Sequence, residues 1–239
     1  MTTKPNARAA AGSVDRRALR DGVYDAVLEM LLDGTTPPGS SLSIDSLARE
    51  LGVSPTPVRE ALVQMEHTGL VSRTALKGYR VAPPLGPEQM AELLDARTML
   101  ELAAVERAVP HTESFLPDLK IAHAEHVLSA HRVRRRQQQH GQPPKGYADL
   151  REYFNADWEF HLVIIRAARN RFLLQMAESL SAHVHRLRQS ADLGVYDLDQ
   201  AVAEHAEIIA AFESGDDLAP VEAMRSHLAG VAERSLEQA

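Results

Sequence analysis

The spacing of apolar residues along the chain predicts helices almost throughout, interrupted by one short hairpin. Between residues 16 and 32, apolar side chains recur every three or four positions, as on one face of a helix, and the pattern stops before Gly34. Residues 1–14 are rich in alanine, threonine and asparagine, and we expect them to be disordered. The ordered chain is therefore expected to begin near residue 15.

Two short helices and a hairpin follow. Residues 44–51 carry one apolar stripe, which Ser43 can cap and the next glycine can end. A second helix starts at Ser54-Pro55-Thr56-Pro57, because serine and threonine cap helices and proline is tolerated in the first turn. The run 70–81, broken by a glycine, predicts a hairpin. This order is typical of a winged helix-turn-helix, which we place at residues 15–82.

Beyond a linker at residues 83–86, helical spacing continues and no alternating strand pattern is found. Asn170 is expected to separate two of the helices. The remaining segment, residues 87–235, is therefore expected to be an all-helical second domain, and the fold class mostly α. The predicted helices are 86–108, 116–136, 148–169, 171–191, 199–213 and 216–233.

Composition narrows the classes of protein that fit this pattern. The 239 residues are 44% apolar and 25% charged, which suits one or two globular domains. There is no cysteine, so disulfides and cysteine zinc sites are excluded, and we expect a cytoplasmic protein. We expect no signal peptide, and no stretch approaches the roughly 20 apolar residues of a membrane helix.

The net charge of −7 is unevenly distributed. Residues 1–84 hold ten basic and nine acidic side chains (+1), and the rest holds sixteen basic and twenty-four acidic side chains (−8). A nearly neutral domain beside an acidic one is compatible with DNA binding, because local charge placement decides phosphate contact.

The N-terminal domain resembles the DNA-binding domain of the GntR family of regulators. The residues that carry the resemblance are Pro38-Gly39, Leu47-Ala48, Leu51-Gly52-Val53-Ser54, Thr56-Pro57-Val58-Arg59-Glu60-Ala61-Leu62, Gly69-Leu70-Val71 and Lys77-Gly78-Tyr79-Arg80-Val81. The resemblance implies that the helix beginning near Thr56 enters the major groove of operator DNA.

DNA contacts follow from this resemblance residue by residue. Ser54, Thr56 and Arg59 would contact phosphates and bases, with Arg59 engaging guanine. Lys77 and Gly78 of the wing would lie in the minor groove. Arg49 would reach a phosphate or remain solvated.

Two departures from the family pattern concern base readout. Pro55 stands where the family usually has arginine, and Asp45 stands where some members have arginine. We therefore expect fewer direct base contacts, or base contacts at shifted positions.

The second domain resembles the FCD domain, the effector domain of FadR-like GntR regulators. This resemblance implies an antiparallel helical bundle around a central cavity. In it, Arg97 and Glu101 would bind an effector, with Arg97 pairing a ligand carboxylate, and a structural salt bridge between the two is the alternative. The motifs that carry it are Arg97-Thr98-Met99-Leu100-Glu101, Asp157-Trp158-Glu159-Phe160-His161 with Asn170, Glu204-His205, Gly215-Asp216 and Met224-Arg225 with His227-Leu228.

A metal site is predicted from spacing as well as from the resemblance. Asp157 and His161 are four residues apart on one helix, so they share a face. His205 and His227 lie eleven residues before and after Asp216, so in an antiparallel hairpin they lie at the same height, roughly 16 Å from the turn. Three imidazoles and a carboxylate suit Zn²⁺, with Ni²⁺ or Mn²⁺ as alternatives. Metal-binding FCD domains use such a set.

The other histidines are expected to take no part. His183 and His185 are two residues apart and cannot share a helix face, so at most one would line the cavity. The remaining histidines are expected at the surface: His67, His111, His123, His126, His131 and His140.

Together these features predict a homodimeric transcription regulator rather than an enzyme. Its affinity for double-stranded operator DNA would be modulated by a small organic acid bound at the metal, and no membrane partner is expected. One alternative is a metal-dependent hydrolase, for which only Glu101 and Glu159 are candidate bases. Glu159 should point away from Asp157 and His161. The other alternative is constitutive DNA binding with a purely structural metal.

Overall fold

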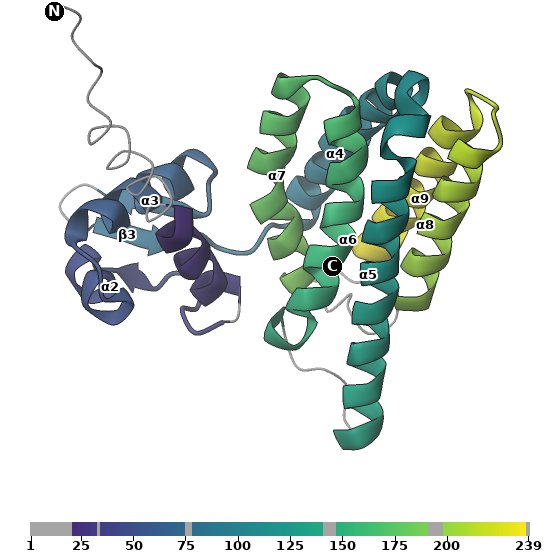
Figure 1. Cartoon of the computed structure of the whole chain (residues 1–239). Coiled ribbons are helices and arrows are strands. Elements are labelled where there is room, and N and C mark those ends of the chain that lie inside the picture. The colour runs from purple at the N-terminus through teal and green to yellow at the C-terminus, as the bar shows by residue number, and fades with distance from the viewer. Residues whose placement is uncertain (1–20, 33, 75–77, 141–146, 191–197, 238–239) are drawn as a thin grey trace, which may run out of the picture. The chain divides into compact units, whose positions relative to one another are not determined.

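The computed structural model describes residues 21–32, 34–74, 78–140, 147–190 and 198–237. The chain divides between Pro83 and Pro84 into two compact units, each described here by itself (Figure 1). Within the described ranges, no helix combines the length and the apolar character needed to cross a membrane.

The N-terminal unit is a winged helix-turn-helix. Residues 21–32 form a helix, and the part of the predicted helix before residue 21 lies outside the described residues. A three-stranded antiparallel sheet has the order β1-β3-β2, and its first strand was not predicted from the sequence. The other elements of the unit are β1 (Ser41–Leu42), α2 (Ile44–Leu51), α3 (Pro55–His67), β2 (Val71–Thr74) and β3 (Gly78–Val81).

The helix ends of this unit follow from capping. The Ser43 hydroxyl accepts a hydrogen bond from the Ser46 amide at 3.3 Å, and Gly52 ends α2 at φ 67°, where a side chain would be strained. Ser54 precedes α3 in an extended conformation, but its side chain makes no capping hydrogen bond. The predicted start of α3 is thus confirmed, and the predicted capping bond of Ser54 is wrong.

The apolar stripes of the helices meet in one core. The apolar stripe of α3, formed by Val58, Ala61, Leu62 and Met65, is completely buried, which leaves the opposite face of that helix exposed. The core side chains are Val23, Val27, Leu31, Leu32, Leu42, Leu47, Ala48, Val58, Ala61, Leu62, Met65, Leu70, Val71, Tyr79 and Val81.

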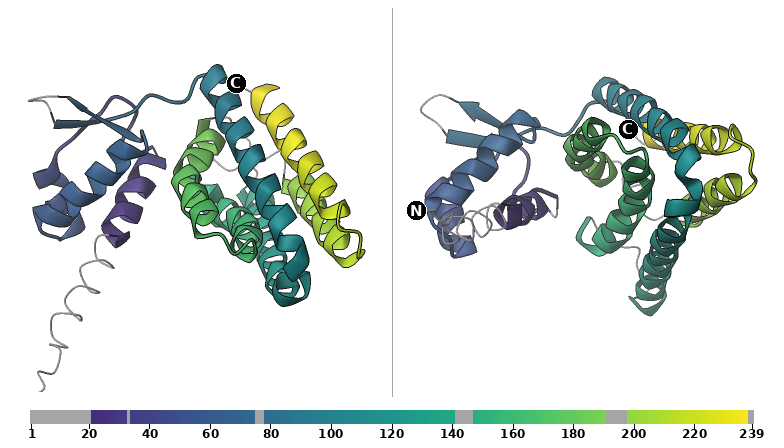
Figure 2. Two further views of the ribbon diagram at one scale, coloured as in Figure 1. Left: turned by 90° about the horizontal axis from the view of Figure 1, so that it is seen from above. Right: turned by 45° about the horizontal axis from the view of Figure 1, so that its top comes forward.

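The second unit is a helical bundle (Figure 2). Helix α5 packs against α6 and α8, and α4 packs against α6, α7 and α9. Helices α8 and α9 also pack against each other, as expected for a hairpin. The elements are α4 (Pro87–Ala108), η1 (Val109–His111), α5 (Thr112–His140), α6 (Tyr147–Ala167), α7 (Arg171–Ser190), α8 (Leu198–Glu213) and α9 (Ala219–Glu237).

Two helix starts differ from the prediction by more than one residue. Helix α5 begins at Thr112 rather than 116, so Pro117 lies inside the helix instead of in its first turn. Helix α9 begins at Ala219 rather than 216, because the Asp216 carboxylate accepts a hydrogen bond from the Leu218 amide at 2.9 Å in the preceding turn. Asn170 separates α6 from α7 as predicted, and its side chain caps the amides of Phe172 and Leu173.

Candidate functional site

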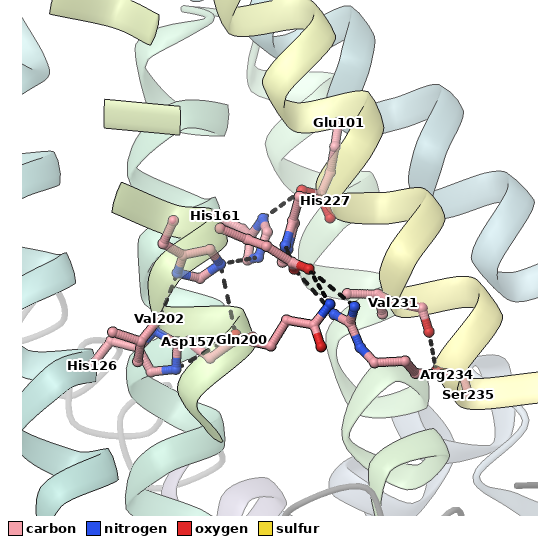
Figure 3. A network of polar contacts seen from close by, with 12 residues as sticks. Glu101, His126, Asp157, His161, Gln200, Val202, His227, Val231, Arg234 and Ser235 are labelled. Carbon is pink, nitrogen blue, oxygen red and sulfur yellow. Dashed lines mark hydrogen bonds and ion pairs between the residues drawn. The ribbon is translucent and has the colours of Figure 1, made fainter. Parts of the chain in front are cut away.

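A cluster of polar side chains lies inside the apolar bundle (Figure 3). Each residue of the cluster is at most 3% exposed, although charged and imidazole groups are costly to bury without partners. We call these seven residues the polar cluster: Arg97 and Glu101 of α4, His126 of α5, Asp157 and His161 of α6, His205 of α8 and His227 of α9. Five helices therefore contribute to one buried site.

The four residues predicted as metal ligands all lie in this cluster. Together with His126, they offer ligand atoms in two sets that share His205. One set is His161, His205 and His227, and the other is His126, Asp157 and His205. Nε2 of His205 lies 3.2 Å from Nε2 of His161 and 3.7 Å from Oδ1 of Asp157. The rings of His205 and His227 have centroids 4.8 Å apart, so the two helices of the α8–α9 hairpin bring them to the same height.

Two of these imidazoles contact carboxylates through Nδ1, the ring nitrogen opposite the candidate ligand atom Nε2. Nδ1 of His161 lies 2.6 Å from Oε2 of Glu101, and Nδ1 of His227 lies 2.7 Å from Oε2 of Glu204. Because an ionised carboxylate only accepts hydrogen bonds, each Nδ1 must donate, which leaves Nε2 as the nitrogen that can bind a metal. Glu204 is itself held by two hydrogen bonds of 3.0 Å from Arg234.

Burial and these partners set the charge of the groups. Burial alone would raise the pKa of Glu101, but the Arg97 charge and the contacts with His161 outweigh it and lower the pKa to about 2. Burial lowers the pKa of His227, and burial with the neighbouring His227 ring lowers the pKa of His205 well below its ordinary value. Glu101 is therefore a carboxylate, and His205 and His227 are neutral at pH 7.

Arg97, one of the two predicted effector residues, contacts both Glu101 and His161. Its Nε donates to Oε1 of Glu101 at 2.5 Å, and its Nη2 lies 3.1 Å from Nε2 of His161. The salt bridge that we considered as an alternative is thus present. The Nη1 atom of Arg97 is buried and has no hydrogen-bond partner among the described residues. The guanidinium therefore has one donor atom left for a ligand.

The prediction that His126 lies at the surface is wrong. Its side chain is fully buried, and its ring packs on Tyr153 and His205 with centroids 4.7 and 4.8 Å away. The sequence held a signal for this, because His126 falls on the buried helical stripe of α5 that includes Leu119, Ala122, Ala130 and Val133.

The remaining histidines vary in exposure. His67 and His131 are exposed as predicted, whereas His111 is half-buried. His123 is also half-buried, with Nε2 3.0 Å from the Val202 carbonyl oxygen. His183 is half-buried and belongs to neither set of ligand atoms. The side chains of His140 and His185 lie outside the described residues.

Glu204 and Arg234 were also not predicted as site residues. Glu204 directly precedes the predicted ligand His205 on α8, and it reaches His227 on α9 instead of a group on its own helix. Only the packing of α8 on α9 brings it there, so no local pattern could have identified its role.

The residues predicted to contact DNA lie on the surface of the N-terminal unit. Ser54, Thr56 and Arg59 are exposed at the start of α3. Arg49 is exposed on α2, where its Nε donates to the Asp45 carbonyl oxygen at 3.3 Å. Gly78 is exposed at the start of β3 with φ 78°, which suits a tight wing turn. Lys77 lies outside the described residues.

Comparison with known proteins agrees with this architecture. The family described as "Bacterial regulatory proteins, gntR family" matches residues 19–81, and the FCD domain matches residues 92–230. The HTH-type transcriptional regulator McbR of Escherichia coli (strain K12) is 30% identical over 169 residues, which are 71% of this chain and 70% of that protein. The probable D-xylose utilization operon transcriptional repressor of Paenarthrobacter nicotinovorans is 28% identical over 214 residues, which are 90% of this chain and 87% of that protein.

Solved structures show the same fold. E. coli McbR/YncC matches with a TM-score of 0.75 at 22% identity, covering 92% of this chain and 98% of that chain. A GntR regulator from Rhodococcus sp. RHA1 matches with a TM-score of 0.69 at 19% identity, covering 93% and 99%. Since the FCD match alone spans more than half of the sequence, the chain belongs to the GntR family of DNA-binding transcription regulators.

Proposed function

We propose that the helical unit binds a divalent metal ion through Asp157, His161, His205 and His227, and that a small carboxylate effector bound there changes operator affinity. The observation that carries this proposal is the convergence of three buried imidazoles and one carboxylate from α6, α8 and α9. A bound Zn²⁺ or similar ion would act as a Lewis acid that holds a carboxylate at an open coordination position.

The distances from His205 to two of the other donor atoms fit such an ion. Ligands about 2.1 Å from a tetrahedral Zn²⁺ lie about 3.4 Å from one another. Nε2 of His205 lies 3.2 Å from Nε2 of His161 and 3.7 Å from Oδ1 of Asp157. Nε2 of His227 is buried with no hydrogen-bond partner among the described residues. The lowered pKa of His205 and of His227 keeps both rings in the neutral form that binds metals.

Arg97 supports a carboxylate as the effector. A divalent ion and the carboxylate of Asp157 would have a net charge of +1 among neutral imidazoles. The charges of Arg97 and Glu101 cancel each other. A single carboxylate would neutralise that charge and accept a hydrogen bond from the buried Nη1 of Arg97. Glu101 cannot donate to an anion, since its pKa is about 2. We therefore assign Glu101 to holding Arg97 and His161, and Arg97 to the effector.

In the N-terminal unit, the proposal assigns base readout to the start of α3. The buried stripe of α3 leaves Arg59 on the opposite, exposed face with Ser54 and Thr56. An exposed arginine in the first turns of a recognition helix can reach guanine O6 and N7. Arg49, Lys77 and Gly78 are assigned to the DNA backbone and the minor groove.

We further propose a homodimer formed through the helical unit. Helices α4 and α7 contact each other. Met99 on α4 is 62% exposed, and Phe172 and Met176 on α7 are 60% and 55% exposed. Large apolar side chains exposed on adjacent helices are typical of an interface. A two-fold dimer would present two reading helices to a pseudo-palindromic operator.

Neither of the two candidate bases of the hydrolase alternative is suited to that role. Glu159 is exposed and forms hydrogen bonds with Arg166 on the surface of α6. Both oxygens of Glu101 are held by Arg97 and His161, and with a pKa of about 2 it is a weak base.

Operator titrations test the proposal against a purely structural metal. The DNA upstream of the protein's own gene would be titrated with metal-free and Zn²⁺-loaded protein, each with and without citrate as a probe carboxylate. We expect citrate to change the affinity only of the Zn²⁺-loaded protein. The variant His205→Ala/His227→Ala should bind DNA without responding to either. If the protein binds Zn²⁺ tightly, and neither citrate nor acetate nor succinate changes its affinity for operator DNA, the alternative of a purely structural metal is favoured.

A further inference from the structure

The third histidine of the proposed metal site, His205, has a different partner from the other two. His161 and His227 each donate from Nδ1 to a carboxylate. Nδ1 of His205 instead lies 3.1 Å from Nδ1 of His126, a fully buried side chain on α5. Helix α5, like α4, supplies no residue to the predicted ligand set.

The contact between these two rings decides which nitrogen of His205 carries a proton. Two neutral imidazoles that face each other through Nδ1 share one proton in the hydrogen bond between them. If His126 donates, the proton of His205 is on Nε2, and that atom cannot bind a metal. If His205 donates, its Nε2 lone pair faces His161 and Asp157.

The other nitrogen of His126 also faces a carboxylate. Nε2 of His126 lies 3.7 Å from Oδ1 of Asp157. Nε2 of His205 lies at the same distance from this oxygen, so the carboxylate alone does not choose between the two states. A metal ion bound to Nε2 of His205 does choose, because the proton of His205 must then be on Nδ1 and Nδ1 of His126 must accept it. Asp157 stabilises the proton that His126 then carries on Nε2. Asp157, His126 and His205 thus form a closed ring of contacts, and a metal ion on Nε2 of His205 fixes the direction of the hydrogen bond between the two imidazoles.

We infer that His126 is a positioning residue of the metal site: its Nδ1 accepts the proton of His205 Nδ1 and so keeps Nε2 of His205 available as a ligand. This inference rests on the proposed function, because it presupposes metal binding by His205. Removing a partner that orients a metal-bound imidazole lowers metal affinity by about 10- to 100-fold.

Two amide substitutions separate this role from direct ligation by His126. The side-chain amide of asparagine occupies roughly the position of Nδ1 of histidine, whereas that of glutamine occupies roughly the position of Nε2. His126→Asn keeps an acceptor for His205, and His126→Gln does not. His126→Leu removes both positions. A matched control is His123→Leu, because His123 lies one turn earlier on α5 and contacts only the Val202 carbonyl oxygen among the hydrogen bonds described for it.

The experiment is a Co²⁺ titration of the full chain, followed by its visible absorption bands, with thermal melting as a check of folding. We expect His126→Asn and His123→Leu to keep Co²⁺ affinity within about threefold, and His126→Gln and His126→Leu to lose about 10- to 100-fold. At saturating Co²⁺ the bands of all folded variants should match those of the wild type, because the set of ligands is unchanged.

Three results would overturn the inference. Equal affinity of the wild type, His126→Gln and His126→Leu would show that His126 does not act on the site. A loss in His126→Asn as large as in His126→Leu, with altered bands at saturation, would make His126 a direct ligand. If the wild type itself binds neither Co²⁺ nor Zn²⁺, the proposed function fails together with the inference. If His126→Leu does not fold, the comparison of the two amide variants still decides.

Discussion

The guanidinium carbon of Arg97 lies 5.4 Å from the ring centroid of Trp158, so the proposed effector residue packs on the only tryptophan of the chain. The same indole lies 6.0 Å from the ring of His161, centroid to centroid. Trp158 is 4% exposed and belongs to the apolar core of α4, α6 and α7. Its fluorescence should therefore report on the polar cluster without the indole being a ligand.

We expect removal of metal by a chelator to change Trp158 emission and to lower the melting temperature. The ion would join α6, α8 and α9, and its loss leaves the carboxylate of Asp157 among imidazoles without a balancing charge. Adding Zn²⁺ or Ni²⁺ back should restore both signals. Fluorescence and thermal melting before and after chelation measure the effect.

The double variant His205→Ala/His227→Ala is the control for this response. It should fold, because the bundle core consists mainly of apolar side chains, and it should not respond to chelator or metal. If metal analysis finds almost no ion in refilled wild type, and chelation changes neither signal, the four-ligand site is wrong.

Arg59→Ala should weaken specific operator binding by roughly 1 to 3 kcal/mol while leaving the fold intact, because an exposed side chain is removed. The matched control is His67→Ala, exposed on the same helix about 12 Å along its axis. Titrations with operator and with base-substituted operators measure both affinity and base preference. Unchanged affinity and preference in Arg59→Ala would remove this residue from base readout.

Phe172→Glu should weaken the proposed dimer, since a charge would replace a large apolar side chain that is 60% exposed on α7. Sedimentation should show the wild type as a dimer at micromolar concentration and the variant shifted toward monomer with weaker operator binding. Ile121→Glu, at a position 64% exposed on α5, should behave like the wild type. A wild type that stays monomeric on operator DNA would contradict the proposed assembly.

The metal-free protein should lose stability as the pH falls below about 6.5. The folded-state pKa of His205 and of His227 is lower than the ordinary value of 6.5, so the unfolded chain takes up protons first. Each group then lowers the free energy of unfolding by up to about 1.4 kcal/mol per pH unit. Glu101 does not contribute between pH 5 and 6.5, because its stabilisation is lost only as the pH falls from about 4.5 toward its folded-state pKa of about 2.

Denaturant unfolding from pH 7 to pH 5 would measure this slope in the wild type and in His205→Ala/His227→Ala. The double variant should show a shallower dependence on pH. Equal slopes would mean that the two imidazoles are already protonated in the folded protein, or that they are solvated there.

The parts of the structure that local rules determine could be predicted from the sequence. The caps at Ser43 and Gly52 and the break at Asn170 depend on a few neighbouring residues, and each was predicted. The pairing of β1 with β3 joins Leu42 to Tyr79, across 36 intervening residues, and two residues of strand carry too little pattern to reveal it.

Prediction from local sequence has the same limit at the candidate site. Asp157 and His161 follow from spacing within one helix, and His205 and His227 from distances to a shared turn. His126 and Glu204 act on residues of other helices, 79 and 23 positions away. Contacts of this kind depend on how α5, α8 and α9 pack, so the partners of the ligands could not be predicted although the ligands could.

Glu204→Gln should lower the affinity for Zn²⁺ by about 10-fold or more, because the carboxylate that orients His227 would be replaced by an amide. A glutamine can still accept a hydrogen bond from Nδ1 of His227. It loses, however, the negative charge that raises the basicity of the ring and binds Arg234 through both oxygens. Glu207→Gln is the control, since Glu207 is exposed on the same helix. Calorimetric titration with Zn²⁺ measures both variants. If Glu204→Gln binds Zn²⁺ as tightly as Glu207→Gln, then the negative charge of Glu204 does not contribute to metal affinity, and an uncharged acceptor for Nδ1 of His227 is sufficient.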